Sequence, residues 1–164
     1  MKRREFLLFG TLLPLLWSND ASAKRKAEDD GDDTVGLRIS VFKDRQIMRV
    51  VAGGNVYVWP VSTGRHGHGT PTGTFTPPKM EKMHHSSIYP KDKDDDEPGA
   101  PMPYCIFITE NYYRIHGTDD EGNLRRPVSH GCVRLSLEHA KKLFELAGFY
   151  GLPNTRIYIH ERYA

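Results

Sequence analysis

The segments HGT (residues 116–118) and SHGCVR (residues 129–134) decide how the rest of this 164-residue chain is interpreted. Between them they place an imidazole, a thiol and a guanidinium among glycines, on His116, Cys132 and Arg134. The chain has only 2 cysteines, and a thiol in this setting is typical of a nucleophile. The two segments therefore predict acyl transfer through a thioester.

Each residue type in these segments has a role in that chemistry. A thiol with the ordinary pKa of about 8.5 is mostly protonated at neutral pH, so Cys132 needs a base or a positive field. We predict that His116 is the base, that the thiol titrates below 8.5 as a thiolate–imidazolium pair, and that a backbone carbonyl such as that of Gly117 fixes the tautomer. The N–H groups of Gly131 and Cys132 are candidate donors to an oxyanion, and Arg134 suits a substrate carboxylate.

The same residues carry a resemblance to a known family. IHGT (115–118) followed by SHGCVRL (129–135) resembles the L,D-transpeptidase (YkuD) family. PVSTG (60–64) and TPTGTF (70–75) look like the family's strand-turn-strand segment, and the resemblance covers residues 36–160. It implies that Cys132 is the nucleophile, that His116 is its base and that the Gly117 carbonyl orients the imidazole. It also puts His130 and Arg134 in the substrate site, and we add Ser129 and Gly131 of the same segment as candidate substrate-binding residues.

The resemblance also implies a reaction. L,D-transpeptidases attack the carbonyl that precedes the terminal D-amino acid of a peptidoglycan tetrapeptide stem, so that the D-residue leaves and a thioester remains on Cys132. An amine of a neighbouring stem then forms a 3-3 cross-link, or an amine of an anchored lipoprotein is attached. Water as the acceptor would make the enzyme an L,D-carboxypeptidase. This route requires no cofactor and no metal, and the motif residues do not choose among the acceptors.

Two other functions remain open from the sequence. In one, His116, His130 and Cys132 bind zinc and leave an open position for water, although the spacing matches no common zinc motif. In the other, the domain is a non-catalytic module that binds the cell wall. For Cys132 the alternative is a buried structural thiol, which the surrounding SHGCVR run disfavours. For Cys105, which lies in an apolar, strand-like run, a structural thiol is the interpretation that we prefer.

The first 23 residues predict an export signal. They hold a basic start, an apolar run over residues 6–17 and small residues at 21–23, with cleavage expected after Ala23. The RR pair at 3–4 resembles a twin-arginine signal, while ordinary secretion stays open. The apolar run is short for a membrane anchor, which needs about 20 residues. We therefore expect a protein of the periplasm or cell wall, with no membrane span after cleavage.

Composition limits the remaining chain to one domain. Residues 24–34 are charged and poor in apolar side chains, which predicts a disordered leader, and the catalytic domain is expected over 35–164. The hydrophobic content of 38% is enough for a core of this size. A formal net charge of +2 is too small to indicate nucleic-acid binding, and we expect a monomer whose partners are peptidoglycan stem peptides.

The hydrophobic pattern predicts a mostly β domain, a sandwich or barrel, with one principal α-helix after the cysteine loop. The helix has Ser136 as its N-cap and an apolar stripe over 140–147, and Gly148 is expected to end it. Residues 79–103 show no clear periodicity and are interpreted as a lid loop over the active cleft. The predicted strands are 37–41, 47–51, 56–61, 73–76, 105–109, 112–115 and 155–160.

Overall fold

The computed structural model describes residues 36–88 and 99–163. The expected export signal (1–23) and leader (24–34) lie outside these residues, as does part of the segment interpreted as a lid. None of the helices in the two described stretches is long and apolar enough to cross a membrane.

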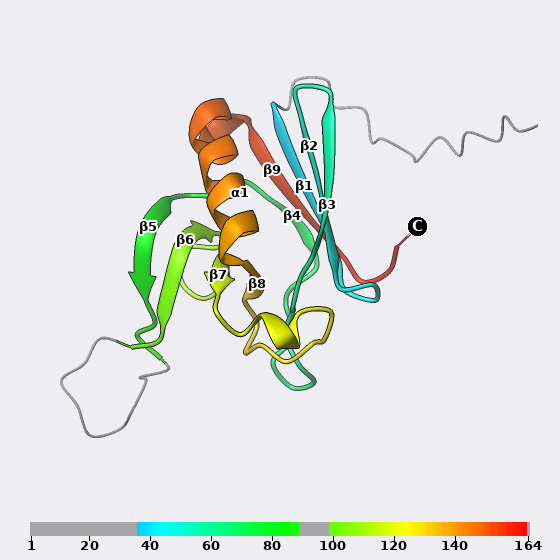
Figure 1. Cartoon of the computed structure of the whole chain (residues 1–164), viewed down its shortest axis with the longest axis vertical. Helices are drawn as coiled ribbons and strands as arrows, with labels where there is room; N and C mark the ends of the chain where they lie inside the picture. The colour runs from blue at the N-terminus through cyan, green and yellow to red at the C-terminus, as the bar shows by residue number, and fades with distance from the viewer. Residues whose placement is uncertain (1–35, 89–98, 164) are drawn as a thin grey trace, which may run out of the picture. The chain divides into compact units, whose positions relative to one another are not determined.

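The described residues form nine strands, arranged in two sheets, and one long helix (Figure 1). The first sheet has the order β3-β2-β1-β9-β4, and the second has the order β5-β6-β7-β8. The elements are β1 Leu37–Phe42, β2 Ile47–Ala52, β3 Asn55–Pro60, β4 Gly73–Phe75, β5 Met80–His85, β6 Pro101–Phe107, β7 Arg114–Thr118, η1 Glu121–Asn123, β8 Val133–Ser136, α1 Leu137–Tyr150, η2 Leu152–Asn154 and β9 Thr155–His160. The predicted class, mostly β with one principal helix, is confirmed.

The five-stranded sheet follows from the alternation of buried and more exposed residues along its central strands, which is complete in β2 and β9. In β1 the side chains of Leu37, Ile39 and Val41 are fully buried, and the intervening residues face outward. Strands β1, β2 and β3 form the predicted antiparallel meander. The last strand, β9, pairs in parallel with β1, from Leu37 opposite Thr155 onward. The chain's final strand therefore completes the sheet that its first strand began.

The four-stranded sheet carries the two motif segments. Strands β6 and β7 form the predicted antiparallel hairpin, with Ile106 opposite Ile115. The structure adds β8, which pairs in parallel with β7 and sets His116 opposite Arg134. The predicted strand 112–115 ended one residue before His116, and this bound was wrong: His116 is the third residue of β7. The strand extends to Thr118 because β8, distant in sequence, supplies its partner.

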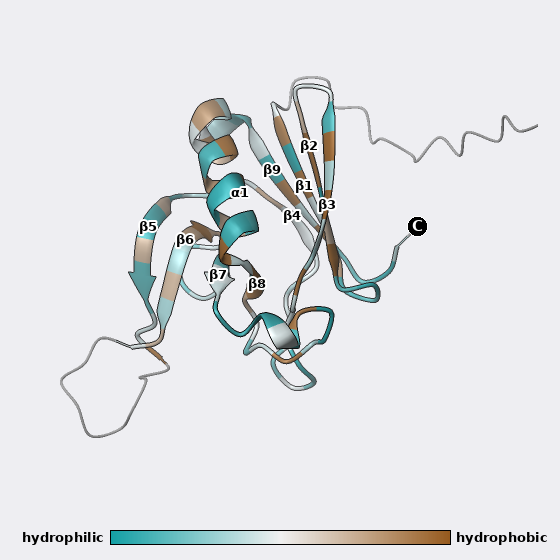
Figure 2. Cartoon of the chain, viewed as in Figure 1, coloured by the Kyte–Doolittle hydropathy of each residue, from teal (hydrophilic) through white to brown (hydrophobic). Residues whose placement is uncertain are grey.

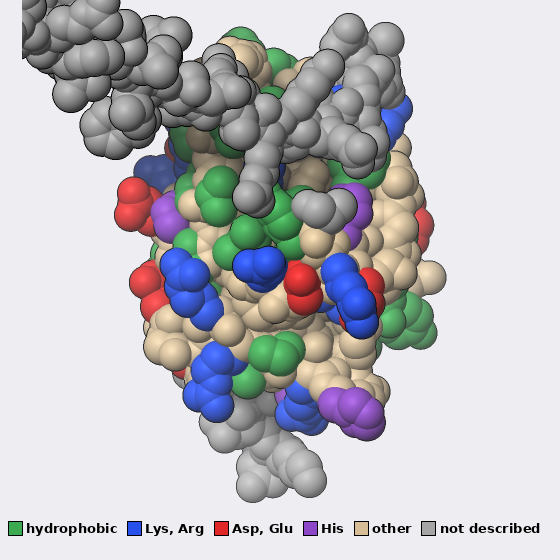
Figure 3. Space-filling view, turned by 90° about the vertical axis from the view of Figure 1, so that its right-hand side faces the viewer, with side chains coloured by type: hydrophobic (Ala, Val, Ile, Leu, Met, Phe, Trp, Pro, Cys, Tyr) green, Lys and Arg blue, Asp and Glu red, His purple; other side chains and the backbone are tan. Residues whose placement is uncertain are grey.

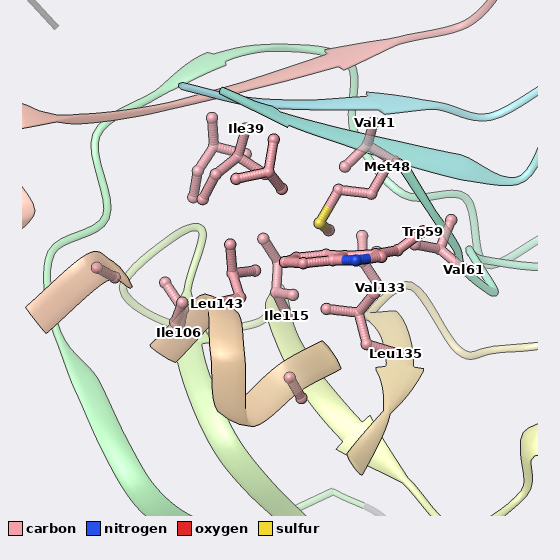
Figure 4. Close-up of a cluster of buried hydrophobic side chains, with 14 of the residues drawn as sticks. Ile39, Val41, Met48, Trp59, Val61, Ile106, Ile115, Val133, Leu135 and Leu143 are labelled. Atoms are coloured by element: carbon pink, nitrogen blue, oxygen red, sulfur yellow. The ribbon is translucent and has the colours of Figure 1, made fainter. Parts of the chain in front are cut away.

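One hydrophobic core fills the space between the two sheets and α1. Figure 4 shows Ile39, Val41 and Met48 from the first sheet pointing toward side chains of β6, β7, β8 and α1. Figure 2 shows the corresponding alternation of hydrophobic and hydrophilic residues along the strands of the five-stranded sheet. The strands of the second sheet present their outward-facing residues to the candidate site, so packing of the core fixes the position of that surface.

Helix α1 begins as predicted and ends later. The Ser136 side chain accepts a hydrogen bond from the backbone N–H of His139 at 3.2 Å, which is an N-cap interaction. The helix continues through Gly148 to Tyr150, so the prediction that Gly148 ends it was wrong. Gly151 ends it instead, with φ of +80°, a conformation that glycine adopts without a side-chain clash.

The segment 79–103 is not the irregular loop that we predicted. It contains β5 and the first residues of β6, which pair antiparallel, with Glu81 opposite Cys105 and Met83 opposite Pro103. The strand was missed because β5 has the sequence MEKMHH and no buried residue, so it lacks an apolar alternation. Residues 89–98 lie outside the described residues, and with them the central part of the expected lid.

The outer side of the five-stranded sheet is mixed in character. Figure 3 faces this side and shows lysine and arginine side chains among hydrophobic and acidic ones. Val56 and Val58, both on the edge strand β3, are 54% and 58% exposed.

Candidate active site

The parallel pairing of β7 and β8 brings the motif residues to one cavity. Alternate residues of a strand share a face, so Cys132 and Arg134 lie on the same face as their neighbour His116. All three side chains line a cavity of about 1050 Å³. Its apolar walls come from β5, β6 and the residues next to them, and these include Met83, Ile88, Pro101, Met102, Pro103 and Tyr104.

The imidazole of His116 is buried and held in one tautomer. Its Nδ1 lies 2.8 Å from the carbonyl oxygen of Gly117. A carbonyl only accepts hydrogen bonds, so Nδ1 carries the proton and the lone pair of Nε2 is available to act as a base. Burial lowers the pKa of His116 to about 4; the Gly117 hydrogen bond opposes that shift, and the charges of Arg134 and Arg114 add to it. The imidazole is therefore neutral at pH 7.

The thiol of Cys132 is half-buried and protonated in the resting protein. Its Sγ donates to the carbonyl oxygen of Tyr112 at 3.9 Å. Burial raises the pKa of Cys132, while a backbone hydrogen bond from Arg114 and the charges of Arg114 and Arg134 oppose that rise. The raised pKa of the thiol and the lowered pKa of His116 both favour a neutral pair. Our expectation of a resting thiolate–imidazolium pair was wrong, because burial disfavours both charges.

The loop before Cys132 is shaped by Ser129 and Gly131. The Ser129 hydroxyl donates to the Cys132 carbonyl at 2.6 Å and accepts from the Gly131 N–H at 3.1 Å. Ser129 thus holds the loop rather than reaching into the cavity with a free hydroxyl. Gly131 has φ of +117°, and a Cβ there would lie 2.9 Å from the Tyr113 ring. The Gly131 N–H already donates to Ser129, so of the two predicted oxyanion donors the Cys132 N–H is the one that stays a candidate.

A second segment, which the sequence analysis did not assign to the site, braces this loop. The Thr70 hydroxyl donates to the Gly131 carbonyl at 2.8 Å and accepts from the Gly64 N–H at 2.9 Å. Ser62 and Arg134 exchange two backbone hydrogen bonds of 3.0 and 2.8 Å. The sequence did contain an indication that these residues matter to the site, because Gly64 and Thr70 belong to the two upstream segments that carry the resemblance.

The two remaining candidate residues lie at the cavity with different surroundings. The His130 ring packs edge-on against His68, with ring centroids 5.1 Å apart. Burial lowers its pKa, and the charges of Arg65, His68 and Arg134 lower it further. The Arg134 guanidinium is 26% exposed and lies 4.0 Å from an Asp120 carboxylate oxygen, which is a loose ion pair. Arg134 is therefore able to turn toward a ligand anion.

Arg134→Lys should reduce kcat/KM about tenfold or more for the stem peptides that the resemblance implies as substrates, because a lysine ammonium cannot make the two parallel hydrogen bonds that a guanidinium makes to a carboxylate. Steady-state kinetics measure this effect, which we expect mainly in KM. Thermal unfolding is the control: the loose pair with Asp120 contributes little, so the melting temperature should stay the same. A melting temperature that falls together with activity would make Arg134 a structural residue.

Gly117 has a second role, because it lets β7 and α1 pack closely at this position. A Cβ at this position would lie 3.0 Å from Leu137 Cδ2, 3.2 Å from Ala140 Cβ and 3.3 Å from Pro103 Cγ. Ala140 is buried in the core and has no freedom to move aside. A side chain at residue 117 would therefore push α1 away from the sheet.

Gly117→Ala should destabilise the fold by about 1–3 kcal/mol through overpacking. Denaturant unfolding monitored by circular dichroism measures this change. Gly122→Ala is the matched control, because a Cβ at Gly122 would meet nothing within 4 Å, and its stability should stay within about 0.5 kcal/mol of the parent. Equal stability of the two variants would contradict the close-approach argument.

The site offers no set of metal ligands among the described residues. Within residues 36–88 and 99–163, no three His, Cys, Asp or Glu side chains gather in a way that would hold a metal ion. The set of His116, His130 and Cys132 required by a zinc site is therefore not assembled. Cys105 is fully buried beside Met102 and Phe107, with no disulfide, and burial raises its pKa to about 12.

Comparison with known sequences gives one family over most of the chain. A family profile described as the L,D-transpeptidase catalytic domain, YkuD, matches residues 37–159. A Bacillus licheniformis protein named as a candidate L,D-transpeptidase, YkuD, is 28% identical over 130 residues, which are 77% of this chain and 67% of the relative.

Solved structures show the same fold. An L,D-transpeptidase from Mycobacterium smegmatis superposes with a TM-score of 0.65 at 22% identity, over 77% of this chain and 59% of that one. L,D-transpeptidase 3 from Mycobacterium tuberculosis, solved with a faropenem-derived adduct, gives 0.64 at 21% identity, over 77% and 61%. The chain thus spans about three fifths of the length of the solved structures that it matches.

Proposed function

Because this chain belongs to the YkuD family of L,D-transpeptidase catalytic domains, we propose that it is a peptidoglycan L,D-transpeptidase that works through a thioester on Cys132. One observation carries the proposal. The Gly117 carbonyl fixes His116 in the tautomer that leaves Nε2 free to accept a proton, in the same cavity as the thiol. A neutral imidazole and a protonated thiol that line one cavity have the protonation states that general-base transfer from sulfur to nitrogen requires.

In the first half of the reaction the thiol attacks the stem carbonyl that precedes the terminal D-amino acid. The Cys132 proton moves to Nε2 of His116 as the S–C bond forms. The carbonyl oxygen gains the negative charge, and the backbone N–H of Cys132 is the candidate donor to it. The Arg134 guanidinium, partly exposed at the cavity, pairs with a carboxylate of the stem.

Acylation is complete when the tetrahedral intermediate collapses and the C–N bond breaks. His116 returns its proton to the leaving amine, so the D-amino acid departs neutral at nitrogen and a thioester remains. An acceptor amine then attacks the thioester, His116 takes the proton of that amine, and the proton finally returns to the Cys132 sulfur. The side chains end in the state in which they began, and no cofactor takes part in these steps.

The acceptor is an amine of a neighbouring stem or of an anchored lipoprotein, and water gives the carboxypeptidase reaction. Export by the predicted signal (1–23) delivers the mature chain to the periplasm or cell wall, where such stems are found. We also propose that a penem or carbapenem acylates Cys132, since its strained carbonyl presents the same target to the thiol. The faropenem-derived adduct of the Mycobacterium tuberculosis relative supports this.

Mass spectrometry of the mature chain incubated with purified tetrapeptide stems tests the proposal. The expected results are a protein adduct equal to the stem without its terminal D-residue, located on Cys132, and a dimeric stem product. Tripeptide stems without dimers would identify the carboxypeptidase. Intact stems and unmodified protein would reject the proposed function and favour a module that binds the wall without turnover.

A further inference from the structure

A buried arginine that is not one of the motif residues lies next to the nucleophile. Arg114 is two residues before His116 on β7, so its side chain lies on the same face of the sheet. The register of β7 and β8 begins with Ile115 opposite Val133, so Arg114 and Cys132 are the residues that directly precede this paired stretch. Arg114 is only 9% exposed, and it lines the same cavity as Cys132. A buried guanidinium is costly unless its surroundings compensate the charge.

The guanidinium of Arg114 is fixed by the backbone and by an aromatic ring. Its Nη1 donates to the Tyr112 carbonyl at 3.0 Å, and its Nη2 donates to the Asn111 carbonyl at 3.3 Å. Its central carbon lies 4.6 Å from the centroid of the buried Phe107 ring. Lys79 lies 4.2 Å from the same centroid and is paired with Glu81 at 3.1 Å. Arg114 therefore has a fixed position and little freedom to follow a substrate.

The Tyr112 carbonyl connects this cation to the nucleophile. It accepts the Arg114 Nη1–H and also the Cys132 thiol, at 3.0 and 3.9 Å. When the thiol loses its proton, the sulfur becomes negative beside an oxygen that is itself partly negative. A guanidinium bound to that oxygen reduces the repulsion and adds a direct attraction to the thiolate.

We propose that Arg114 is the positioning residue of the nucleophile: held on Phe107 and two carbonyls, it stabilises the Cys132 thiolate that forms when the proton passes to His116. The inference rests on the proposed function for its biological meaning, but the thiolate itself is measurable without any stem peptide. Arg114 would be a cation of the active site that lies outside both motif segments.

The groups around the sulfur agree with this assignment. Arg114 from β7 and Arg134 from β8 are the two cations that oppose the rise in the pKa of Cys132. His116 from β7 is the neutral base, and Cys105 from β6 is a buried, protonated thiol. Arg114 is also the leading influence that opposes the rise in the pKa of Cys105.

The test is the rate at which iodoacetamide alkylates Cys132, measured from pH 6 to 11.5 on samples whose fold is verified at each pH, with peptide mass mapping to separate Cys132 from Cys105. Arg114→Met should move the midpoint of the pH profile upward by about one unit or more, which is about tenfold slower alkylation below the midpoint. Arg114→Lys, which keeps the charge, should move the midpoint less.

Arg156→Met is the matched control. Arg156 also donates to two backbone carbonyls, those of Pro153 and Thr155, at 2.8 and 3.1 Å, but it lies on β9 and does not line the cavity. Its alkylation profile should equal that of the parent.

An unchanged midpoint in folded Arg114→Met would overturn the inference, even if that variant unfolds at a lower temperature. If Arg114→Met is unfolded, Arg114→Gln decides, because it removes the charge while its amide N–H can still donate to a backbone carbonyl. A midpoint equal to the parent's in folded Arg114→Gln, together with a lowered melting temperature, would make Arg114 purely structural. A shifted midpoint supports the inference whether or not stem peptides are turned over. Loss of the proposed function is therefore distinguishable from loss of this assignment.

Discussion

Cys132→Ala should abolish formation of the acyl-enzyme with both stems and penems, while the protein stays folded. The alanine has no nucleophilic atom, and the loop around residue 132 is held by Ser129 and by backbone contacts that do not involve the sulfur. Intact-mass analysis after incubation measures the adduct, and circular dichroism verifies the fold. An adduct that persists in this variant would move the nucleophile to another residue.

Cys105→Ala is the matched control, because it removes the other thiol of the chain. Cys105 is fully buried, so losing its sulfur leaves a small cavity that costs on the order of 1 kcal/mol. Turnover should continue, with the melting temperature lowered by a few degrees. Equal inactivation of the two variants, without unfolding, would contradict the assignment of the chemistry to Cys132 alone.

His116→Ala should lower kcat roughly 100- to 10,000-fold, which is the range for loss of a positioned general base. His116→Gln separates the base from the hydrogen bond: a glutamine amide can still donate to the Gly117 carbonyl, but it cannot accept the thiol's proton as an imidazole does. Both variants should therefore be impaired alike in single-turnover acylation. Rescue by glutamine would show that orientation of the loop, and not proton transfer, is what His116 supplies.

The pH dependence of acylation follows from the pKa of His116, which burial lowers to about 4. The base must be neutral to accept a proton, so the acylation rate should fall as pH drops through about 4 and stay level from there toward neutrality. An acidic limb centred near 6.5, the ordinary value for histidine, would contradict the buried, neutral imidazole. The rate is measured by adduct formation with a penem, on samples whose fold is verified at each pH.

The same depressed pKa predicts a loss of stability in acid. The unfolded chain binds a proton at His116 below about 6.5, whereas the folded chain binds it only below about 4. Stability supplied by the neutral form is therefore complete above pH 6.5 and is lost as pH falls toward 4, by on the order of 3 kcal/mol. His116→Gln should lack this part of the acid sensitivity, and urea unfolding at pH 7 and pH 4.5 measures the difference.

Most strands of this fold could be predicted because their patterns are local. Alternation in β1 and β2, and the helical stripe of α1 with Ser136 as its cap, require only neighbouring residues. Strand β5 could not be predicted in this way, because its sequence shows no alternation of apolar and polar residues. It is a strand because its backbone pairs with that of β6. Gly148 was misjudged for the opposite reason: packing of α1 on the core offsets the cost of a glycine within the helix.

Arg114 could have been singled out from the sequence, because it shares the period-two face of His116 in a strand that was predicted. The contacts of its side chain could not have been predicted from the sequence. They depend on Phe107, which belongs to a different strand, and on the backbone of the turn between β6 and β7. The brace from Thr70 to Gly131 likewise joins residues 61 positions apart, and no local pattern encodes it.

By itself the sequence determined the family, the mostly β class, the pairing of β6 with β7 and the residues of the two motif segments, because these rest on residue types and short spacings. Only the tertiary structure decided the parallel pairing of β7 and β8, which lines up His116 with Arg134 and brings Arg114 to Cys132. It also decided the protonation of the pair. The sequence supplies a thiol and an imidazole, but burial, which depends on the whole packed core, raises one pKa and lowers the other so that both groups are neutral until they react.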